Sequence, residues 1–110
     1  MANTFKSTST ALTTATQTIY QAPATAGNVG IVLSVLVANV NGTASADLTL
    51  TKTTSADAVQ ANIAYTVPVA PDTTLEVVAN KIVLMAGEKL RASASAASYL
   101  QATVSVMEIT

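Results

Sequence analysis

The sequence predicts an all-β fold: a single β-sandwich of about seven to eight antiparallel strands with an extended N-terminal arm. Its 110 residues suffice for one domain with one core. Short stretches of β-branched and other apolar residues, several alternating with polar ones, recur along the chain, separated by Gly, Pro, Asn and Asp. The Ala-rich stretch 93–99 lacks a cap and the apolar periodicity of a helix, and we find no convincing helix elsewhere. We expect either a jelly-roll or an immunoglobulin-like arrangement.

The first segment, residues 1–17, is rich in Thr, Ser and Ala and has few large apolar side chains. Segments of low hydrophobicity seldom become ordered alone. Two interpretations remain open: a frayed tail or edge strand, and an arm that becomes ordered on a neighbouring subunit. The second interpretation carries equal weight, because Phe5 and Leu12 are apolar anchors that a plain tail does not need. We therefore divide the chain into an arm or edge strand at 1–17 and a sandwich domain at 18–110.

The strongest predicted strand covers residues 30–38, and strict alternation makes both of its faces apolar. One face carries Ile31, Leu33, Val35 and Val37, and the other carries Val32 and Leu36. A strand that is apolar on both faces is typical of a central strand covered on both sides. Because the second sheet covers one face only, we expect a subunit interface on the other. The candidate interface residues are Phe5, Leu12, Val32 and Leu36.

Turn residues and proline organise the rest of the chain. Asn41-Gly42 predicts a hairpin with a type I′ turn, in which both residues take positive φ. In the following strand, Leu48 and Leu50 are expected to share one face. Pro68 cannot donate to a β-ladder, so its strand should lie at a sheet edge. A turn at Gly87 leads into another strand, and the last strand covers 99–109, with Leu100, Ala102, Val104 and Val106 on one face.

The composition argues against an enzyme, because the chain has no His, Cys or Trp. The carboxylates, Glu108 included, are expected on wet strand faces or at turns. No phosphate loop, serine-nucleophile motif or Asp-rich calcium pattern is present, so we expect no cofactor and no metal.

Charge and hydropathy give little sign of a nucleic-acid or membrane partner. The net charge is −1, and the five Lys and Arg residues are scattered along the chain, which does not favour nucleic-acid binding. No apolar run reaches the roughly 20 residues of a membrane span, and we expect no secretory signal. A net charge near zero favours association.

Several stretches together resemble small virion structural proteins of tailed bacteriophages. They are 18–24 (TIYQAPA) with the apolar strand 31–38 and the turn 39–42, 47–51 (DLTLT), 81–94 (KIVLMAGEKLRASA) and 102–109 (ATVSVMEI). The third stretch contains an apolar-apolar-x-x-Gly-acid-x-apolar pattern, interpreted as a hairpin near the C-terminus. The resemblance covers roughly residues 18–109 and is one of strands and turns, so it transfers no site residues.

The resemblance implies a non-enzymatic capsid decoration, or cement, subunit that stabilises a phage head through protein contacts. The implied location is the virion, most simply the capsid surface, after assembly in the host cytoplasm. The implied partners are copies of the same chain, as a homotrimer or other homo-oligomer, and the major capsid protein or other virion proteins. Two alternatives stay open: a neck or tail-fibre module of the virion, and a carbohydrate-binding β-sandwich module whose candidate sugar platforms include Tyr20 and Tyr99.

Overall fold

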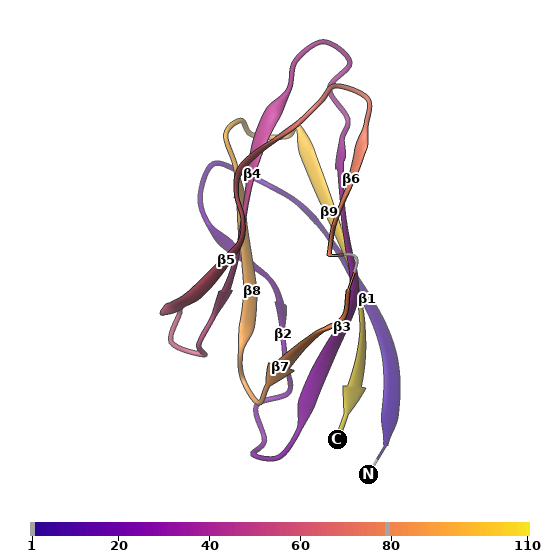
Figure 1. Cartoon of the computed structure of the whole chain (residues 1–110), viewed down its shortest axis with the longest axis vertical. Coiled ribbons are helices and arrows are strands. Elements are labelled where there is room, and N and C mark those ends of the chain that lie inside the picture. Colours follow the sequence, from indigo (N-terminus) through magenta and orange to yellow (C-terminus); the bar gives the residue numbers. More distant parts are fainter. Residues whose placement is uncertain (1, 79) are drawn as a thin grey trace.

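A computed structural model of the chain, which describes residues 2–78 and 80–110, contains two packed antiparallel sheets (Figure 1). One sheet, called sheet A here, has the strand order β1-β9-β3-β6, with β7 also pairing with β3. The other, sheet B, has the order β2-β8-β4-β5. The strands found in the described residues are β1 (Asn3–Ala11), β2 (Gln17–Gln21), β3 (Val29–Asn39), β4 (Ala46–Thr53), β5 (Val59–Val69), β6 (Thr74–Val78), β7 (Ile82–Met85), β8 (Lys89–Ala94) and β9 (Leu100–Ile109).

The strand pairing is nested, as in a long hairpin folded over on itself. β1 pairs with β9, β2 with β8, β3 with both β6 and β7, and β4 with β5. The pairs β3–β9 and β4–β8 then join these units into sheets. This is a jelly-roll arrangement, so the predicted β-sandwich is confirmed and the jelly-roll alternative describes its topology. One result of the nesting is that the chain ends lie side by side (Figure 1), with the Ala2 N–H donating to the Thr110 carbonyl over 2.8 Å.

The N-terminal segment forms an edge strand within this protomer. Residues of β1 pair in continuous register with β9, from Asn3 opposite Ile109 to Ala11 opposite Gln101. Almost every side chain of β1 is exposed, so the strand is held mainly by backbone hydrogen bonds. Leu12, directly after it, is completely buried and anchors the connection to β2.

The central strand β3 departs from strict alternation, and this corrects the predicted faces. The β3–β9 register shifts between Val32 and Ser34, which leaves Leu33 as the extra residue of a β-bulge. Beyond a bulge, the side chains exchange faces. Val32 and Val35 therefore both point into the core, whereas Ile31, Leu33 and Leu36 lie on the outer face.

Two predicted hairpins are also corrected, because each connects strands of different sheets. β3 and β7 lie in sheet A, whereas the strands that follow them, β4 and β8, lie in sheet B. Neither Asn41 nor Gly42 takes positive φ. Instead, the Asn41 side-chain oxygen accepts hydrogen bonds from the N–H groups of Thr43 and Ala44, each over 2.8 Å. Gly87 does adopt the left-handed conformation expected of a turn, with φ of 79°.

The core between the sheets consists mainly of aliphatic side chains. The predicted inward positions Leu48 and Leu50 on β4 are fully buried, as are the four predicted on the last strand: Leu100, Ala102, Val104 and Val106. Pro68 lies on the edge strand β5, as predicted. Asn39 is a buried polar exception whose amide donates to the carbonyls of Ala44 and Val69, and it thereby fastens the β3–β4 connection to the end of β5.

Truncation of a core leucine is expected to destabilise the fold strongly. Leu50→Ala should lower the free energy of unfolding by about 2–5 kcal/mol, because it removes buried methyl groups and leaves a cavity. The matched control is Val59→Ala at an exposed position of β5, where a change within about 0.5 kcal/mol is expected. Urea unfolding of both variants measures the difference, and equal losses would contradict the assigned core.

Candidate interaction face

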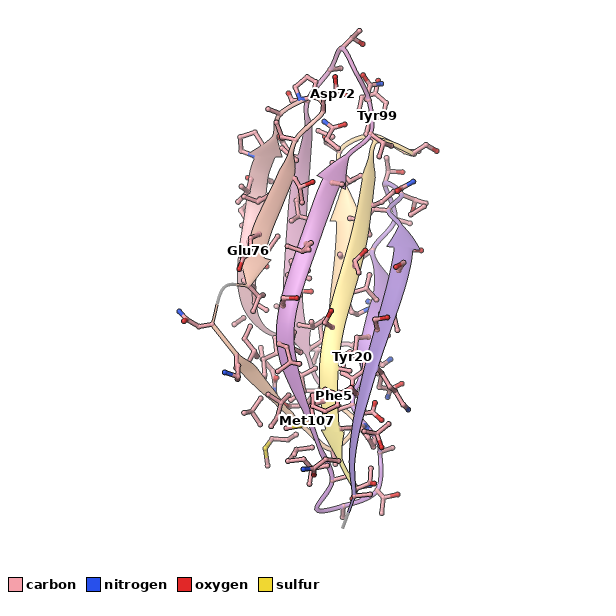
Figure 2. All side chains as sticks on the ribbon, turned by 90° about the vertical axis from the view of Figure 1, so that its right-hand side faces the viewer. Phe5, Tyr20, Asp72, Glu76, Tyr99 and Met107 are labelled. Atoms are coloured by element: carbon pink, nitrogen blue, oxygen red, sulfur yellow. The ribbon has the colours of Figure 1, made fainter. Side chains whose placement is uncertain are left out.

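The outer face of sheet A carries a continuous set of apolar side chains near the chain ends. The strand registers align Phe5 of β1 with Met107 of β9, Met107 with Ile31 of β3, and Ile31 with Val83 of β7. The neighbouring row aligns Ile109, Val29 and Met85 in the same way. With Leu33 from the bulge, these residues are called the apolar patch. Figure 2 shows this face, with Phe5 and Met107 labelled on adjacent strands.

Several members of the apolar patch are open to solvent in the protomer. Phe5 is 72% exposed, Met85 58% and Val83 51%, and the other members are half-buried. Isolated apolar residues on a surface are ordinary, but a contiguous group typically marks an interaction site. The patch therefore distinguishes this face from the rest of the described surface.

The outer face of sheet A is also nearly free of charge. Beyond the patch it continues with small uncharged residues, among them Ser7, Ser105 and Thr103. Among the described strand residues of this face, Glu76 on the edge strand β6 is the one charged side chain (Figure 2). Packing this face against another surface buries little charge, which removes a large desolvation cost.

Lys6, Lys52, Lys89 and Arg91 instead lie beside carboxylates away from this outer face. On the outer side of sheet B, Asp57 accepts a 2.8 Å hydrogen bond from the Lys89 ammonium and lies 3.6 Å from Arg91. These interactions, led by the hydrogen bond from Lys89, hold the pKa of Asp57 below its usual value. Lys52 forms a 3.1 Å ion pair with Glu88. This mixed pattern differs from the single-sign basic surface that nucleic-acid binding requires.

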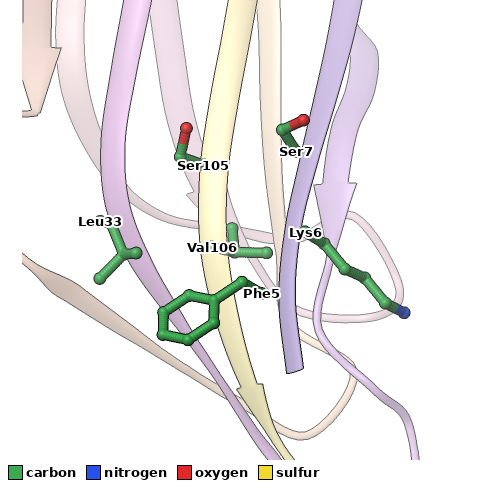
Figure 3. A pocket seen from close by; sticks show the side chains of 6 residues that line it. All are labelled: Phe5, Lys6, Ser7, Leu33, Ser105 and Val106. Carbon is green, nitrogen blue, oxygen red and sulfur yellow. The ribbon is translucent and has the colours of Figure 1, made fainter. Parts of the chain in front are cut away.

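A shallow hollow of about 330 Å³ adjoins the apolar patch (Figure 3). Phe5 on β1 and Leu33 on β3 form its two sides, and the backbone of β9 at Ser105 and Val106 forms its floor. The Lys6 side chain points away from the opening (Figure 3). The hollow thus offers apolar sides and the two small hydroxyls of Ser7 and Ser105, a lining suited to a mainly apolar side chain.

A cluster of three residues around the buried carboxylate of Glu108 fixes the edge strand that carries Phe5. The Glu108 carboxylate on β9 accepts a 2.7 Å hydrogen bond from the Tyr20 hydroxyl on β2 and forms a 2.9 Å ion pair with Lys6 on β1. The cluster connects β1 and β9 of sheet A to β2 of sheet B. Because Lys6 is next to Phe5 in β1, the cluster also fixes the position of Phe5 in the apolar patch. This corrects the expectation that Glu108 lies on a wet face, since only 6% of the residue is exposed.

The environment of the cluster shifts two pKa values. Burial alone raises the pKa of Glu108, but the hydrogen bonds from Lys6 and Tyr20 and the charge of Lys6 outweigh it, so the net pKa lies below the usual value. Burial and the hydrogen bond to Glu108 raise the pKa of the Tyr20 hydroxyl. Glu108 is therefore ionised, and Tyr20 is a neutral donor, across the physiological range.

Gly30 makes room for this cluster. A Cβ atom on Gly30 lies 2.7 Å from the Tyr20 hydroxyl oxygen and 3.1 Å from its ring, closer than packing allows. A glycine inside a strand often marks such a close approach.

The predicted interface residues divide into two pairs. Phe5 and Leu36 lie exposed on the outer face of sheet A, where they stay candidates. Leu12 and Val32 have no exposed surface and belong to the protomer's own core, so they offer nothing to a second subunit. Sequence reasoning missed Ile31, Met107 and Val83. Each of these residues alternates with inward-facing neighbours in the sequence, which indicates an outward position. That the three lie side by side follows only from the strand registers.

The described residues contain no group of three or more Asp or Glu side chains placed to hold a metal ion. In the same part of the chain, no helix has the length and apolarity needed to cross a membrane.

Comparison with known proteins gives a structural neighbour. A solved structure from the work "Bacillus endospore appendages form a novel family of disulfide-linked pili" matches with a TM-score of 0.60 over 99% of this chain and 87% of that one. The sequences are 9% identical, so the likeness shows the fold alone. No protein-family model matches the chain, and no curated protein does.

The Glu108 cluster predicts a specific pH dependence of stability. Because its folded-state pKa lies below the ordinary value of 4.5, the stabilisation is present above that pH and disappears as pH falls through the folded-state pKa. Wild type should therefore be more stable than Glu108→Gln at neutral pH, and the two should converge in acid. Urea unfolding across pH measures this, with Glu76→Gln at an exposed position as the control. If Glu108→Gln follows the same profile as the control, the cluster has no stabilising role.

Proposed function

We propose that this chain is a non-enzymatic structural subunit that assembles with copies of itself into a larger structure. The observation that carries the proposal is the outer face of sheet A, which combines the apolar patch with an almost uncharged surround. Burying such a face against another subunit makes the free energy of association more favourable by about 25 cal/mol per Å² of apolar area, before the costs of association. The fold likeness to a pilus subunit supports the same class of function.

We expect this chain to assemble without disulfide links between its copies. The neighbouring structure is described as belonging to disulfide-linked pili, whereas this chain has no cysteine. Packing and hydrogen bonding between subunits therefore replace covalent links, and many repeated contacts act together to stabilise a multi-copy structure.

The setting that we propose is the surface of a tailed-phage head, where the chain acts as a decoration subunit. The support is the strand-and-turn resemblance of residues 18–109 to small virion proteins. An extracellular appendage is the alternative setting, and it is supported by the fold likeness. A neck or tail-fibre module of the virion fits the same protomer and differs only in copy number.

The carbohydrate-binding alternative has weaker support. Tyr20 is buried and hydrogen-bonded to Glu108, so its ring is not a surface platform for a sugar. Tyr99 is half-buried, and Tyr65 is the one well-exposed tyrosine, at 67%. A single exposed ring does not make the stacking surface that this alternative requires.

Self-assembly is tested with the purified full chain. Sedimentation velocity and negative-stain electron microscopy should show oligomers or ordered arrays that increase with protein concentration. A reducing agent should leave the distribution unchanged, since no disulfide contributes. A chain that stays monomeric from micromolar to millimolar concentration would refute self-assembly.

The setting is tested separately by immunogold labelling with an antibody against the chain, applied to particles and cells from its source. Dense labelling of phage heads supports decoration, and sparse labelling of one vertex or of tails supports a neck or tail module. Labelled filaments on cells support an appendage and contradict the virion setting.

A further inference from the structure

Self-assembly requires a defined contact, and the outer face of sheet A has features that select a particular partner. We propose that this face packs against the same face of a second copy, about a two-fold axis that runs along β9 between the two sheets. The inference rests on the proposed function and specifies its contact geometry.

The absence of charge favours a second copy as the occupant. An isologous interface brings the same surface of both copies together, so a charge near the two-fold axis meets its own like charge. On the described strands of this face, only Glu76 is charged, and it lies on β6, at the edge away from β1. Self-apposition therefore brings no like charges together near the axis, whereas the mixed charges on the outer side of sheet B offer no such match.

The proposed axis brings apolar side chains of the two copies opposite one another. Phe5, on β1, projects on one side of β9, and Ile31 and Leu33, on β3, lie on the other. A two-fold axis along β9 exchanges these sides, so Phe5 of each copy lies opposite Ile31 and Leu33 on β3 of the other. The small side chain of Ser105 lies on the axis, where two copies approach most closely.

The size of the face suits a dimer. About an axis over β9, the strands β1, β9 and β3 of one copy overlap β3, β9 and β1 of the other. Three strand positions about 4.8 Å apart, and a ten-residue β9 at about 3.3 Å per residue, give a flat area on the order of 500 Å². A standard protein interface buries about 800 Å² per partner, and side-chain relief adds to the flat area. Aligned sheets pack about 10 Å apart with strands crossing at about 30°, which β9 against β9 allows.

Charge reversal of the patch tests the proposal. Phe5→Glu should weaken dimerisation at least about 100-fold, because a buried aromatic anchor is lost and a charge is buried in both copies at once. The matched control is Val59→Glu, at a similarly exposed position on β5 of sheet B. It should leave the dissociation constant within about threefold of wild type, since surface changes away from a contact have small effects. Sedimentation equilibrium measures the constants, and circular dichroism verifies that both variants fold.

A second measurement tests the axis itself. The chain has no cysteine, so single-cysteine variants report one position each. A short bis-maleimide reagent should link Ser105→Cys into a covalent dimer with high yield. Ser93→Cys, on the outer face of β8 in sheet B, should remain largely unlinked.

The outcomes separate this contact from the general proposal. Loss of association in Phe5→Glu together with linkage at Ser105 supports the two-fold face. If wild type assembles but Phe5→Glu and Val59→Glu behave alike, the face contact is wrong and self-assembly stands. A wild-type chain that stays monomeric overturns both.

Discussion

The β-bulge at Leu33 is the local constraint on which both the core and the outer face depend. By inserting one residue into β3, it allows Val32 and Val35 to point inward together with Val37, while Ile31, Leu33 and Leu36 point outward. A regular strand would send Val35 and Val37 to the same face as Ile31 and deprive the core of two buried valines. Leu33, the extra residue of the bulge, lies on the outer face and lines the hollow.

The edge strand β1 depends on this central strand through β9. β9 lies between β1 and β3, and its outward residues Met107 and Ile109 connect the apolar side chains of its neighbours. The Glu108 cluster holds β1 in place from its inner side. The buried carboxylate of Glu108 thereby helps to position the exposed ring of Phe5. Phe5 thus projects from a strand that both sheets restrain, which favours a contact with a rigid partner.

Much of the fold could be predicted from the sequence because strand alternation is a local property. The inward positions on β4 and β9, the edge placement of Pro68 and the turn at Gly87 all follow from residue type and spacing. The bulge could not be predicted, because the pairing of β3 with β9 determines it. The connection at Asn41 was taken for a hairpin because local turn residues do not reveal that the chain crosses between sheets. Glu108 was placed in water because its partners, Lys6 and Tyr20, are distant in sequence.

The proposed contact between copies of this protein lies on the outer face of sheet A. Methyl NMR tests this directly, because two of the three methionines, Met85 and Met107, lie in the apolar patch. In a dilution series from millimolar to micromolar concentration, their methyl signals should shift, while those of Val59 on sheet B stay fixed. Methionine signals that do not change while the chain associates would contradict the account.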